Sequence, residues 1–597
     1  MTSDEAVNEG SLDALNANIT KIEELSQRLV AAFSNKRQHD SGLSAPGQDL
    51  MMKAAGAYWS ELVSNPGRII ELQASYWGKT LQHFVDAQQA LATGKLIAPE
   101  DKTPSDRRFA NPLWQTHPYF NFIKQQYFLN ADAVQSAVEQ LDELEETDKR
   151  RIEYFSRQII DAFSPTNFLA TNPDALEKAV ETDGQSLVDG LENLVHDIEA
   201  SEGDLLVTLA DKDAFTVGKN IATTEGSVVY RNRMFELIQY TPQTETVHRT
   251  PLIIFPPWIN KFYIMDLKPQ NSLLNWVVEQ GFTVFVVSWV NPDADYADVG
   301  IETYIEEGYL EAISRVKEIT GEKQVNAVGY CIAGTTLSMT LSLLKKRKDT
   351  SIKSATFFTT ITDFSDQREF TPFLQDDFVE GIEREVADKG YLDSFFMSRT
   401  FSYLRSNDLI YQPAIRSYMM GETPPAFDLL YWNGDSTNLP AKMIVEYLRE
   451  LCQQNSFAGN GIELCGETLS IKDVTLPLFA VACEADHIAN WEDSYRGVSL
   501  MGSRNKTFVL SESGHIAGII NPPSKKKYGH YTNEDAKLGS EDWLRAATFN
   551  DGSWWPRWSE WLAKRSGKQV PARHIETPLC PAPGTYVLGE HSEYESV

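Results

Sequence analysis

A short box of small residues around Cys331 carries the clearest chemistry in this sequence. It reads GYCIAG at 329–334 and lies between the apolar run QVNAVGY and the helix-forming run TTLSMTLSLLKKRK. Small residues permit the tight strand-to-helix turn that exposes a nucleophile, and the N-terminus of the following helix favours a thiolate. We predict that Cys331 is a nucleophile, with a buried structural cysteine as the alternative for this box alone. The fifth place, usually glycine, is Ala333, and Gly334 follows it.

Two later residues complete a catalytic set with Cys331. Asp486 follows the apolar run LPLFAVACEA, and His515 follows TFVL within the stretch SGH. The order nucleophile, acid, histidine is that of the α/β-hydrolase triad, whose members lie at the ends of strands. His487, directly after Asp486, is the alternative base. We assign the base to His515 because side chains adjacent in sequence usually point apart.

Acyl transfer also needs N–H donors aimed at the oxyanion that develops in the transition state. The backbone N–H of Ile332, next after the nucleophile, is the expected first donor. The second is expected from the loop PPWIN at 256–260. Its prolines have no N–H, so we expect Trp258 or Ile259; the alternative is that this loop only packs.

The spacing of apolar residues predicts an α/β fold with three regions. Short β-rich runs (TPLIIF, FTVFVVSW, VNAVGY, SATFF, LPLFAVAC, TFVL) alternate with helical sequence after residue 220, and SVVYRNRMFELIQYTP indicates a hairpin. This predicts a mostly parallel sheet covered on both faces at 221–597. The interval of about 365–472 is too long for a βα connection, so we expect an inserted cap. Residues 51–220 are expected to be mainly helical, and 1–50 a mobile segment.

Composition excludes several classes of function. Lys and Arg total 54 against 84 Asp and Glu, a net charge of −30, which opposes binding to nucleic acid and electrostatic docking to anionic membranes. The five cysteines are scattered, without metal-ligand spacing, so no metal site is expected. No apolar run approaches the roughly 20 residues of a membrane span, and no secretory signal is visible at the N-terminus. The protein is therefore expected to be cytoplasmic.

Longer stretches of the chain resemble a known family, the class I polyhydroxyalkanoate synthases. The resemblance covers nearly everything from about 106 to 588. It is carried by DRRFANPLW, FIKQQYFL, SPTNFLATNP, PPWINKFYIMDL, NSLLNWVVEQG, VSWVNPD, GYCIAGT, LLYWNGDSTNLP, DHIANW, SGHIAG and GSWWPRWSEWL.

The resemblance implies an α/β-hydrolase fold with an inserted cap and a helical N-terminal domain. It implies that Cys331 carries the acyl chain as a thioester, with His515 as general base and Asp486 as the carboxylate. The implied reaction polymerises short (R)-3-hydroxyacyl-CoA into polyester with release of CoA, and needs no cofactor. A homodimer is implied, attached to the surface of a polyester granule with phasin-like proteins; helices within 52–93 are the candidate granule contact.

Further residues are candidate substrate contacts. His487 and Asn260 lie next to proposed catalytic residues, and Lys525, Lys526 and Lys527 follow His515, where cations would suit the phosphates of CoA. A solvated loop is the alternative for the lysines. Two other functions stay open: a cysteine-dependent esterase, thioesterase or depolymerase on the same fold, and a non-catalytic granule protein. The intact set of Cys331, Asp486 and His515 argues against the second.

Overall fold

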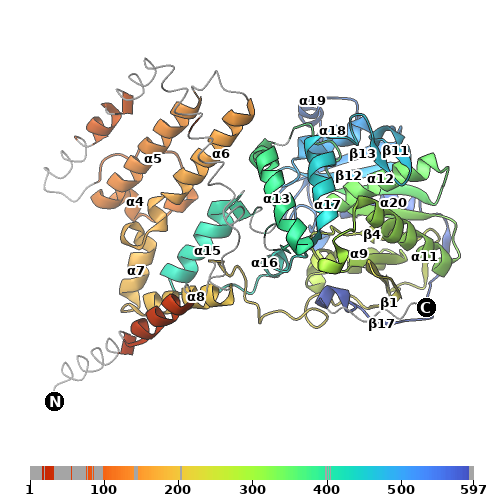
Figure 1. Cartoon of the computed structure of the whole chain (residues 1–597), viewed down its shortest axis with the longest axis horizontal. Coiled ribbons are helices and arrows are strands. Elements are labelled where there is room, and N and C mark those ends of the chain that lie inside the picture. The colour runs from red at the N-terminus through yellow and green to blue at the C-terminus, as the bar shows by residue number, and fades with distance from the viewer. Residues whose placement is uncertain are drawn as a thin grey trace. The chain divides into compact units, whose positions relative to one another are not determined.

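A mixed sheet of eleven strands forms the centre of the larger part of the molecule (Figure 1). The computed structural model describes residues 17–18, 20–32, 56, 75–76, 78–83, 85, 98–139, 146–201, 205–366, 368–394, 396, 400, 402–403 and 405–589. The strand order is β15-β14-β13-β12-β7-β6-β4-β5-β2-β1-β17. The bounds are β1 Gly226–Arg231, β2 Phe235–Tyr240, β4 Leu252–Phe255, β5 Val284–Trp289, β6 Val325–Tyr330, β7 Ile352–Phe358, β12 Leu478–Cys483, β13 Lys506–Ser511, β14 His530–Thr532, β15 Thr548–Asn550 and β17 Cys580–Pro581.

The central strands β13, β12, β7, β6, β4 and β5 are mutually parallel. The β-rich runs of the sequence form these strands, as predicted, and β1 pairs with β2 as the expected hairpin. The borders differ from the prediction of a mostly parallel sheet, because β2 is antiparallel to β5 and β14 is antiparallel to β13. The three residues between β1 and β2 reverse the chain direction, as in a hairpin.

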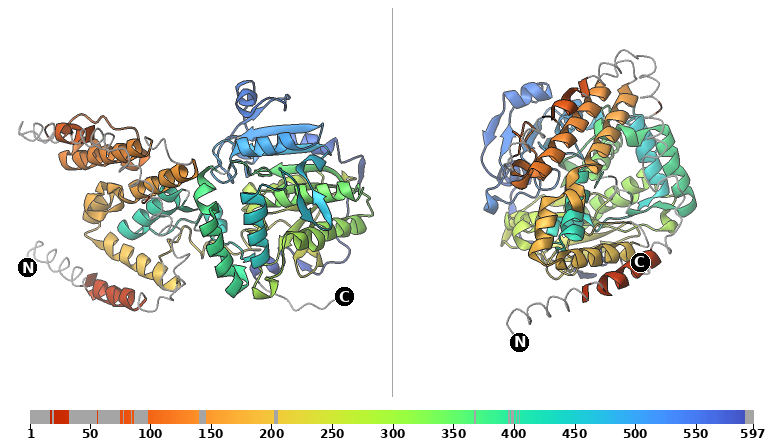
Figure 2. Two further views of the ribbon diagram at one scale, coloured as in Figure 1. Left: turned by 45° about the horizontal axis from the view of Figure 1, so that its top comes forward. Right: turned by 90° about the vertical axis from the view of Figure 1, so that its left-hand side faces the viewer.

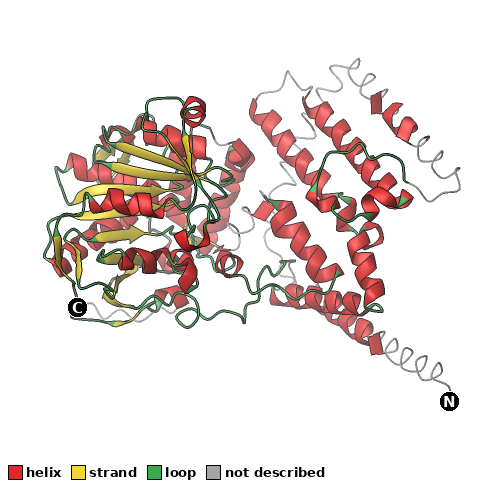
Figure 3. Ribbon diagram, turned by 180° about the vertical axis from the view of Figure 1, so that it is seen from behind, coloured by secondary structure: helices red, strands yellow, loops and turns green. Residues whose placement is uncertain are grey.

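Side chains of alternate strand residues divide between two covered faces of the sheet. In β4, Leu252 and Ile254 belong to a buried cluster with residues of α9 (Leu273–Glu279) and α20 (Trp555–Ala563). Phe255 points the other way, because it stacks on Tyr309 of the π-helix η7 (Tyr304–Leu310). All four residues of β4 are buried, as expected for a strand covered on both faces. Figure 2 and Figure 3 show this layer of strands between helices.

Contacts divide the chain into two units. The sheet unit comprises Lys212–Gln367, Asp376–Phe401 and Ala426–Val597. The helical unit comprises Met1–Asp211, Arg368–Gln375 and Ser402–Pro425. Its longer helices are α5 Pro118–Glu139, α6 Glu146–Ala162, α7 Pro173–Glu181 and α8 Gln185–Ala200. The insertion expected at about 365–472 therefore supplies two segments to the helical unit. None of the described helices combines the length and apolar character that crossing a membrane requires.

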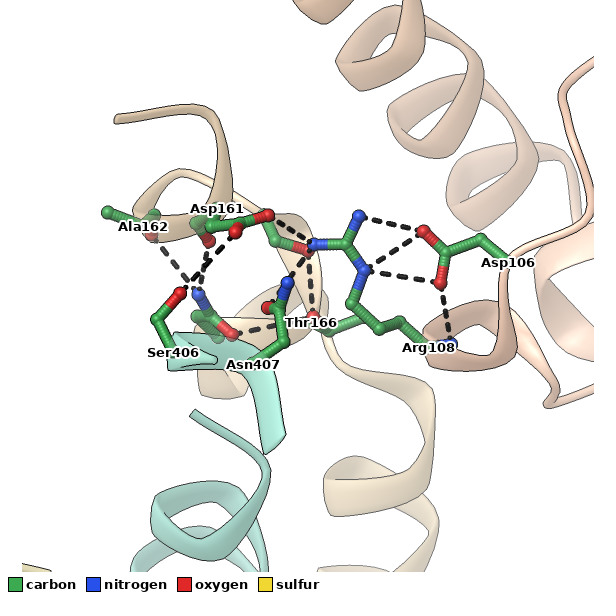
Figure 4. A network of polar contacts seen from close by, with 9 residues as sticks. Asp106, Arg108, Asp161, Ala162, Thr166, Ser406 and Asn407 are labelled. Carbon is green, nitrogen blue, oxygen red and sulfur yellow. Dashed lines mark hydrogen bonds and ion pairs between the residues drawn. The ribbon is translucent and has the colours of Figure 1, made fainter. Parts of the chain in front are cut away.

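A polar network inside the helical unit joins segments that lie far apart in sequence (Figure 4). The guanidinium of Arg108 donates to both carboxylate oxygens of Asp106 and, over 3.1 Å, to Asp161 at the end of α6. Arg108 also contacts Asn407, and Ser406 donates to Asp161. Because Ser406 and Asn407 come from the insertion, this network fixes an inserted segment to the helices of the N-terminal region.

Candidate active site

Cys331 occupies the turn between β6 and α12 (Ile332–Lys346) with a strained backbone. Its φ is 54° and its ψ is −125°, a conformation that disfavours any residue with a Cβ and costs about 1–3 kcal/mol. Neighbouring groups hold it there: its N–H donates to the carbonyl of Phe358 over 2.7 Å, and the Thr360 hydroxyl donates to its carbonyl over 3.2 Å. A strained residue at a strand-to-helix turn is the backbone of a nucleophile elbow.

Two glycines allow the elbow to close. A Cβ on Gly329 would lie 2.5 Å from the Cα of Gly334, and one on Gly334 would lie 2.7 Å from Cγ2 of Thr360. Both distances are shorter than van der Waals contact. Ala333, the fifth residue of the box, is fully buried in α12 and keeps its Cβ. The position at which Thr360 comes too close for a Cβ is Gly334, so the fifth place can be alanine.

Asp486 and His515 form a hydrogen-bonded pair after β12 and β13. Oδ2 of Asp486 lies 2.7 Å from Nδ1 of His515, and both side chains are buried. The other carboxylate oxygen accepts the backbone N–H groups of Ile488 and Ala489, each over 2.8 Å. Asp486 is therefore fixed by its own loop and holds the imidazole by one nitrogen, which leaves Nε2 for another partner.

The imidazole of His515 is biased toward its protonated form. Burial lowers its pKa, but the charge of Asp486 and the charge and hydrogen bonding of Cys331 raise it, with a net rise from 6.5 to about 10. Cys331 is among the groups that raise the pKa of His515, so the proposed nucleophile lies near the Asp486–His515 pair. It is His515, rather than His487, that pairs with the carboxylate.

Sequence reasoning missed three residues that support this set. Tyr330 donates its hydroxyl to the carbonyl of His515 over 3.2 Å, and its ring stacks on the imidazole with centroids 5.9 Å apart. Tyr309 donates to the carbonyl of Ala333 over 2.9 Å, and Thr360 binds the carbonyl of Cys331 as described above. Tyr330 stands inside the box itself; for the other two, the sequence offers no periodic signal.

The predicted oxyanion donors lie on adjoining elements of the sheet unit. β4 is the neighbour of β6, with Phe255 opposite Gly329, so the loop after β4 begins beside the elbow. The indole of Trp258 donates to Thr336 on the elbow helix over 3.3 Å. Within the part of the chain that the structure describes, the backbone N–H groups of Trp258, Ile259 and Ile332 donate to no protein acceptor.

The candidate substrate contacts are placed as follows. Asn260 continues the same loop and forms an isolated bridge with Ser436. His487 is half-buried beside Asp486. The three lysines lie exposed on the turn between β13 and β14, where Lys527 lies over the ring of Tyr528 at 4.8 Å.

One group of possible metal ligands occurs among the described residues. The ligand atoms of Glu302, Glu306 and Cys465 lie within 4.8 Å of one another, with both carboxylates exposed. Burial, then the charges of Glu306 and Glu302, raise the pKa of the Cys465 thiol to about 12. Arg347 already lies 3.4 Å from Glu306. A protonated thiol and a paired carboxylate make a poor cation site.

The sheet unit, its elbow and the buried Asp486–His515 pair define a protein of the α/β-hydrolase fold. Comparison with family models agrees: the model for the alpha/beta hydrolase fold matches residues 251–522. A second model, for the N-terminus of poly-beta-hydroxybutyrate polymerase (PhaC), matches residues 105–277.

Relatives extend the match over most of the chain. A poly(3-hydroxyalkanoate) polymerase from Methylorubrum extorquens is 43% identical over 86% of this chain and 84% of its own. Polymerase PhaC subunits from Rhizobium etli and Cupriavidus necator are 40% and 38% identical, over 89% and 87% of this chain and 84% and 88% of theirs. The chain belongs to the poly(3-hydroxyalkanoate) polymerase family and is an enzyme of the acyltransferase class.

Proposed function

We propose that this chain polymerises short (R)-3-hydroxyacyl-CoA into polyester with release of CoA, through a thioester on Cys331. The observation that carries the proposal is the strained elbow at Cys331 beside the buried Asp486–His515 pair. Family membership supports the polymerisation, because the matched relatives are named poly(3-hydroxyalkanoate) polymerases.

Acylation begins when the sulfur of Cys331 attacks the carbonyl carbon of the CoA thioester. His515, whose pKa is raised to about 10, already holds the thiol proton, and Asp486 stabilises the imidazolium. The carbonyl oxygen becomes an oxyanion that accepts the N–H of Ile332 and one from the loop after β4. As the tetrahedral intermediate collapses, the carbon–sulfur bond to CoA breaks, and the CoA thiolate takes the proton from His515.

Elongation uses the same groups in a second transfer. The 3-hydroxyl of another unit gives its proton to His515 while its oxygen attacks the Cys331 thioester. An oxygen ester forms, the bond between the carbonyl carbon and the sulfur of Cys331 breaks, and the sulfur takes back the proton that His515 received from the hydroxyl. Because one thioester replaces another in acylation, the chain stays reactive until the more stable ester forms. Water must be kept out, since it would release free acid.

Partners of this reaction are part of the proposal. We assign Lys525, Lys526 and Lys527 to the phosphates of CoA, and His487 and Asn260 to the acyl group. A cytoplasmic homodimer on the polyester granule, accompanied by phasin-like proteins, follows from the family resemblance. The granule contact proposed for 52–93 falls mostly outside the described residues.

The test supplies (R)-3-hydroxybutyryl-CoA to the purified protein and follows free CoA thiol and turbidity together. A Cys331→Ala variant is the control. CoA release with growing turbidity that the variant lacks supports a cysteine-dependent polymerase. Release of CoA with soluble acid alone would instead make the protein a thioesterase. Release that persists in the variant would remove Cys331 from the mechanism.

A further inference from the structure

Residues 432–438 of the insertion, called here the support loop, lie against the loop that carries the second oxyanion donor. Both belong to the sheet unit, although about 170 residues separate them in sequence. An isolated antiparallel bridge joins Asn260 to Ser436. The indole of Trp432 donates to the carbonyl of Lys261 over 2.7 Å. This pairing resembles a short strand ladder, in which the backbone of one segment sets the backbone of the other.

Thr437 binds the two peptide groups on which the donor depends. Its hydroxyl donates to the carbonyl of Trp258 over 2.9 Å, and its N–H donates to the carbonyl of Ile259 over 3.3 Å. Thr437 is 3% exposed, so neither bond competes with bulk water. Buried hydrogen bonds of this kind fix orientation because the partner groups have no alternative.

Because the peptide is planar, holding the carbonyl of Trp258 also fixes the direction of the Ile259 N–H. The carbonyl of Trp258 and the N–H of Ile259 belong to one peptide, and in a trans peptide they point to opposite sides. When Thr437 holds the carbonyl toward the support loop, the N–H of Ile259 is turned away from it. That N–H donates to no acceptor among the described residues, so it is available to bind an oxyanion.

A partly buried charge pair fixes the other end of the loop. Asp435 accepts from Lys261 over 2.6 Å and from the hydroxyl of Tyr263 over 2.7 Å. The Lys261 side chain is 12% exposed. Together with Trp432, these contacts hold the residues that follow the donor, so the loop is anchored on both sides of Ile259.

We infer that the support loop is the positioning element of the oxyanion hole, that Thr437 is its main positioning residue, and that Ile259 rather than Trp258 supplies the second donor. The inference rests on the proposed function, since only an acyl-transfer site needs this donor. It also gives the insertion a role in catalysis, because the oxyanion hole is complete only while the support loop is packed against the loop after β4.

The experiment compares two reactions of the same cysteine in the full-length protein. Attack on (R)-3-hydroxybutyryl-CoA develops an oxyanion, whereas alkylation of the thiol by iodoacetamide displaces iodide and develops none. Thr437→Val keeps the side-chain shape and removes the hydroxyl donor. We expect single-turnover CoA release by Thr437→Val to slow roughly 10-fold or more. This effect should stay below the roughly 10²–10³-fold loss that follows removal of an oxyanion donor itself. The rate of alkylation by iodoacetamide should stay unchanged. Thr437→Ser should restore most of the CoA release.

Thr340→Val is the matched control. Thr340 is fully buried in α12 and donates to the carbonyl of Thr336 over 2.9 Å, so this change loses an equivalent bond away from the loop. It should leave both rates near those of the unmodified protein. If Thr437→Val does not fold, Asp435→Asn replaces it, with the same split between the two reactions expected.

Each outcome decides one question. CoA release unaffected by Thr437→Val, or slowed only in step with alkylation, would overturn the positioning role. CoA release that survives complete alkylation of Cys331 in the unmodified protein would instead overturn the proposed function, whatever the Thr437 variants do.

Discussion

The two oxygens of the Asp486 carboxylate bind different groups. One oxygen is held by backbone N–H groups of its own loop, and the other is bound to His515. The imidazole is thereby fixed in one ring orientation, and its protonated form is favoured despite burial. A substitution that removes the charge of Asp486 but keeps the shape of its side chain separates the effect of the charge from the effect on ring orientation.

Asp486→Asn is therefore expected to reduce CoA release by about 10³–10⁴-fold, as for similar changes in hydrolytic triads. It should also lower the pKa of His515, because burial, which lowers this pKa and is the largest influence on it, is then opposed by less negative charge.

In the unmodified protein the pKa of His515 is raised from 6.5 to about 10. This shift contributes folding stability that is complete below pH 6.5 and is lost as the pH rises through 10.

The measurement is the melting temperature of both proteins between pH 6 and pH 10. The advantage of the unmodified protein over Asp486→Asn should be largest at pH 6 and should shrink toward pH 10. A difference that stays constant across this range would contradict a charged His515 in the folded state.

At the scale of elements, the elbow depends on how closely α12 approaches the end of β7. Gly334 faces the side chain of Thr360, which itself binds the carbonyl of Cys331. Gly334→Ala should lower the free energy of unfolding by about 1–3 kcal/mol, the usual cost of overpacking, although alanine is the better helix former. Urea denaturation measures this loss.

Two further variants identify its cause. Ala333→Gly should cost only about 1 kcal/mol through helix propensity, since no close contact is relieved. In a Thr360→Ala background, Gly334→Ala should lose much of its effect, because Oγ1 and Cγ2, the two closest atoms, have been removed and only Cβ, at 2.9 Å, remains. An equal loss in both backgrounds would mean that the contact with Thr360 is not the reason for glycine.

The β-rich runs that form the central strands could be predicted because each is local in the sequence, and the proposed triad residues were chosen by the same signal. Each apolar run ends in a turn, and Cys331, Asp486 and His515 each follow one of these runs. The support loop could not be found in this way. Its side chains bind backbone carbonyls of the loop after β4, as when the Thr437 hydroxyl donates to the carbonyl of Trp258, and backbone acceptors leave no pattern in the sequence.

At the scale of the whole molecule, the insertion belongs to both units. Asn193 of α8 donates to the carbonyls of Ser417 and Glu422, and the hydroxyl of Tyr418 donates to Asp197 over 2.7 Å. The boundaries proposed from sequence treated the insertion as a single cap. Sequence offered no sign of this division, because helical periodicity shows that a segment is amphipathic but not which partner covers it.

Deleting residues 1–211 should therefore loosen Ser402–Pro425 before it disturbs the sheet. Without α8, the hydrogen bonds of Ser417 and Tyr418 lose their partners, so local opening becomes easier. Trypsin should cleave after Arg405 and Arg416 at least about 10-fold faster than in the full chain, equivalent to about 1.4 kcal/mol of lost protection. Arg347, at the end of α12 in the sheet unit, is the internal control and should be cleaved at an unchanged rate. Equal cleavage rates after Arg405 and Arg416 in both proteins would contradict a role of residues 1–211 in ordering this segment. Faster cleavage after Arg405 and Arg416, with no change at Arg347, would establish that the N-terminal helices order this part of the insertion.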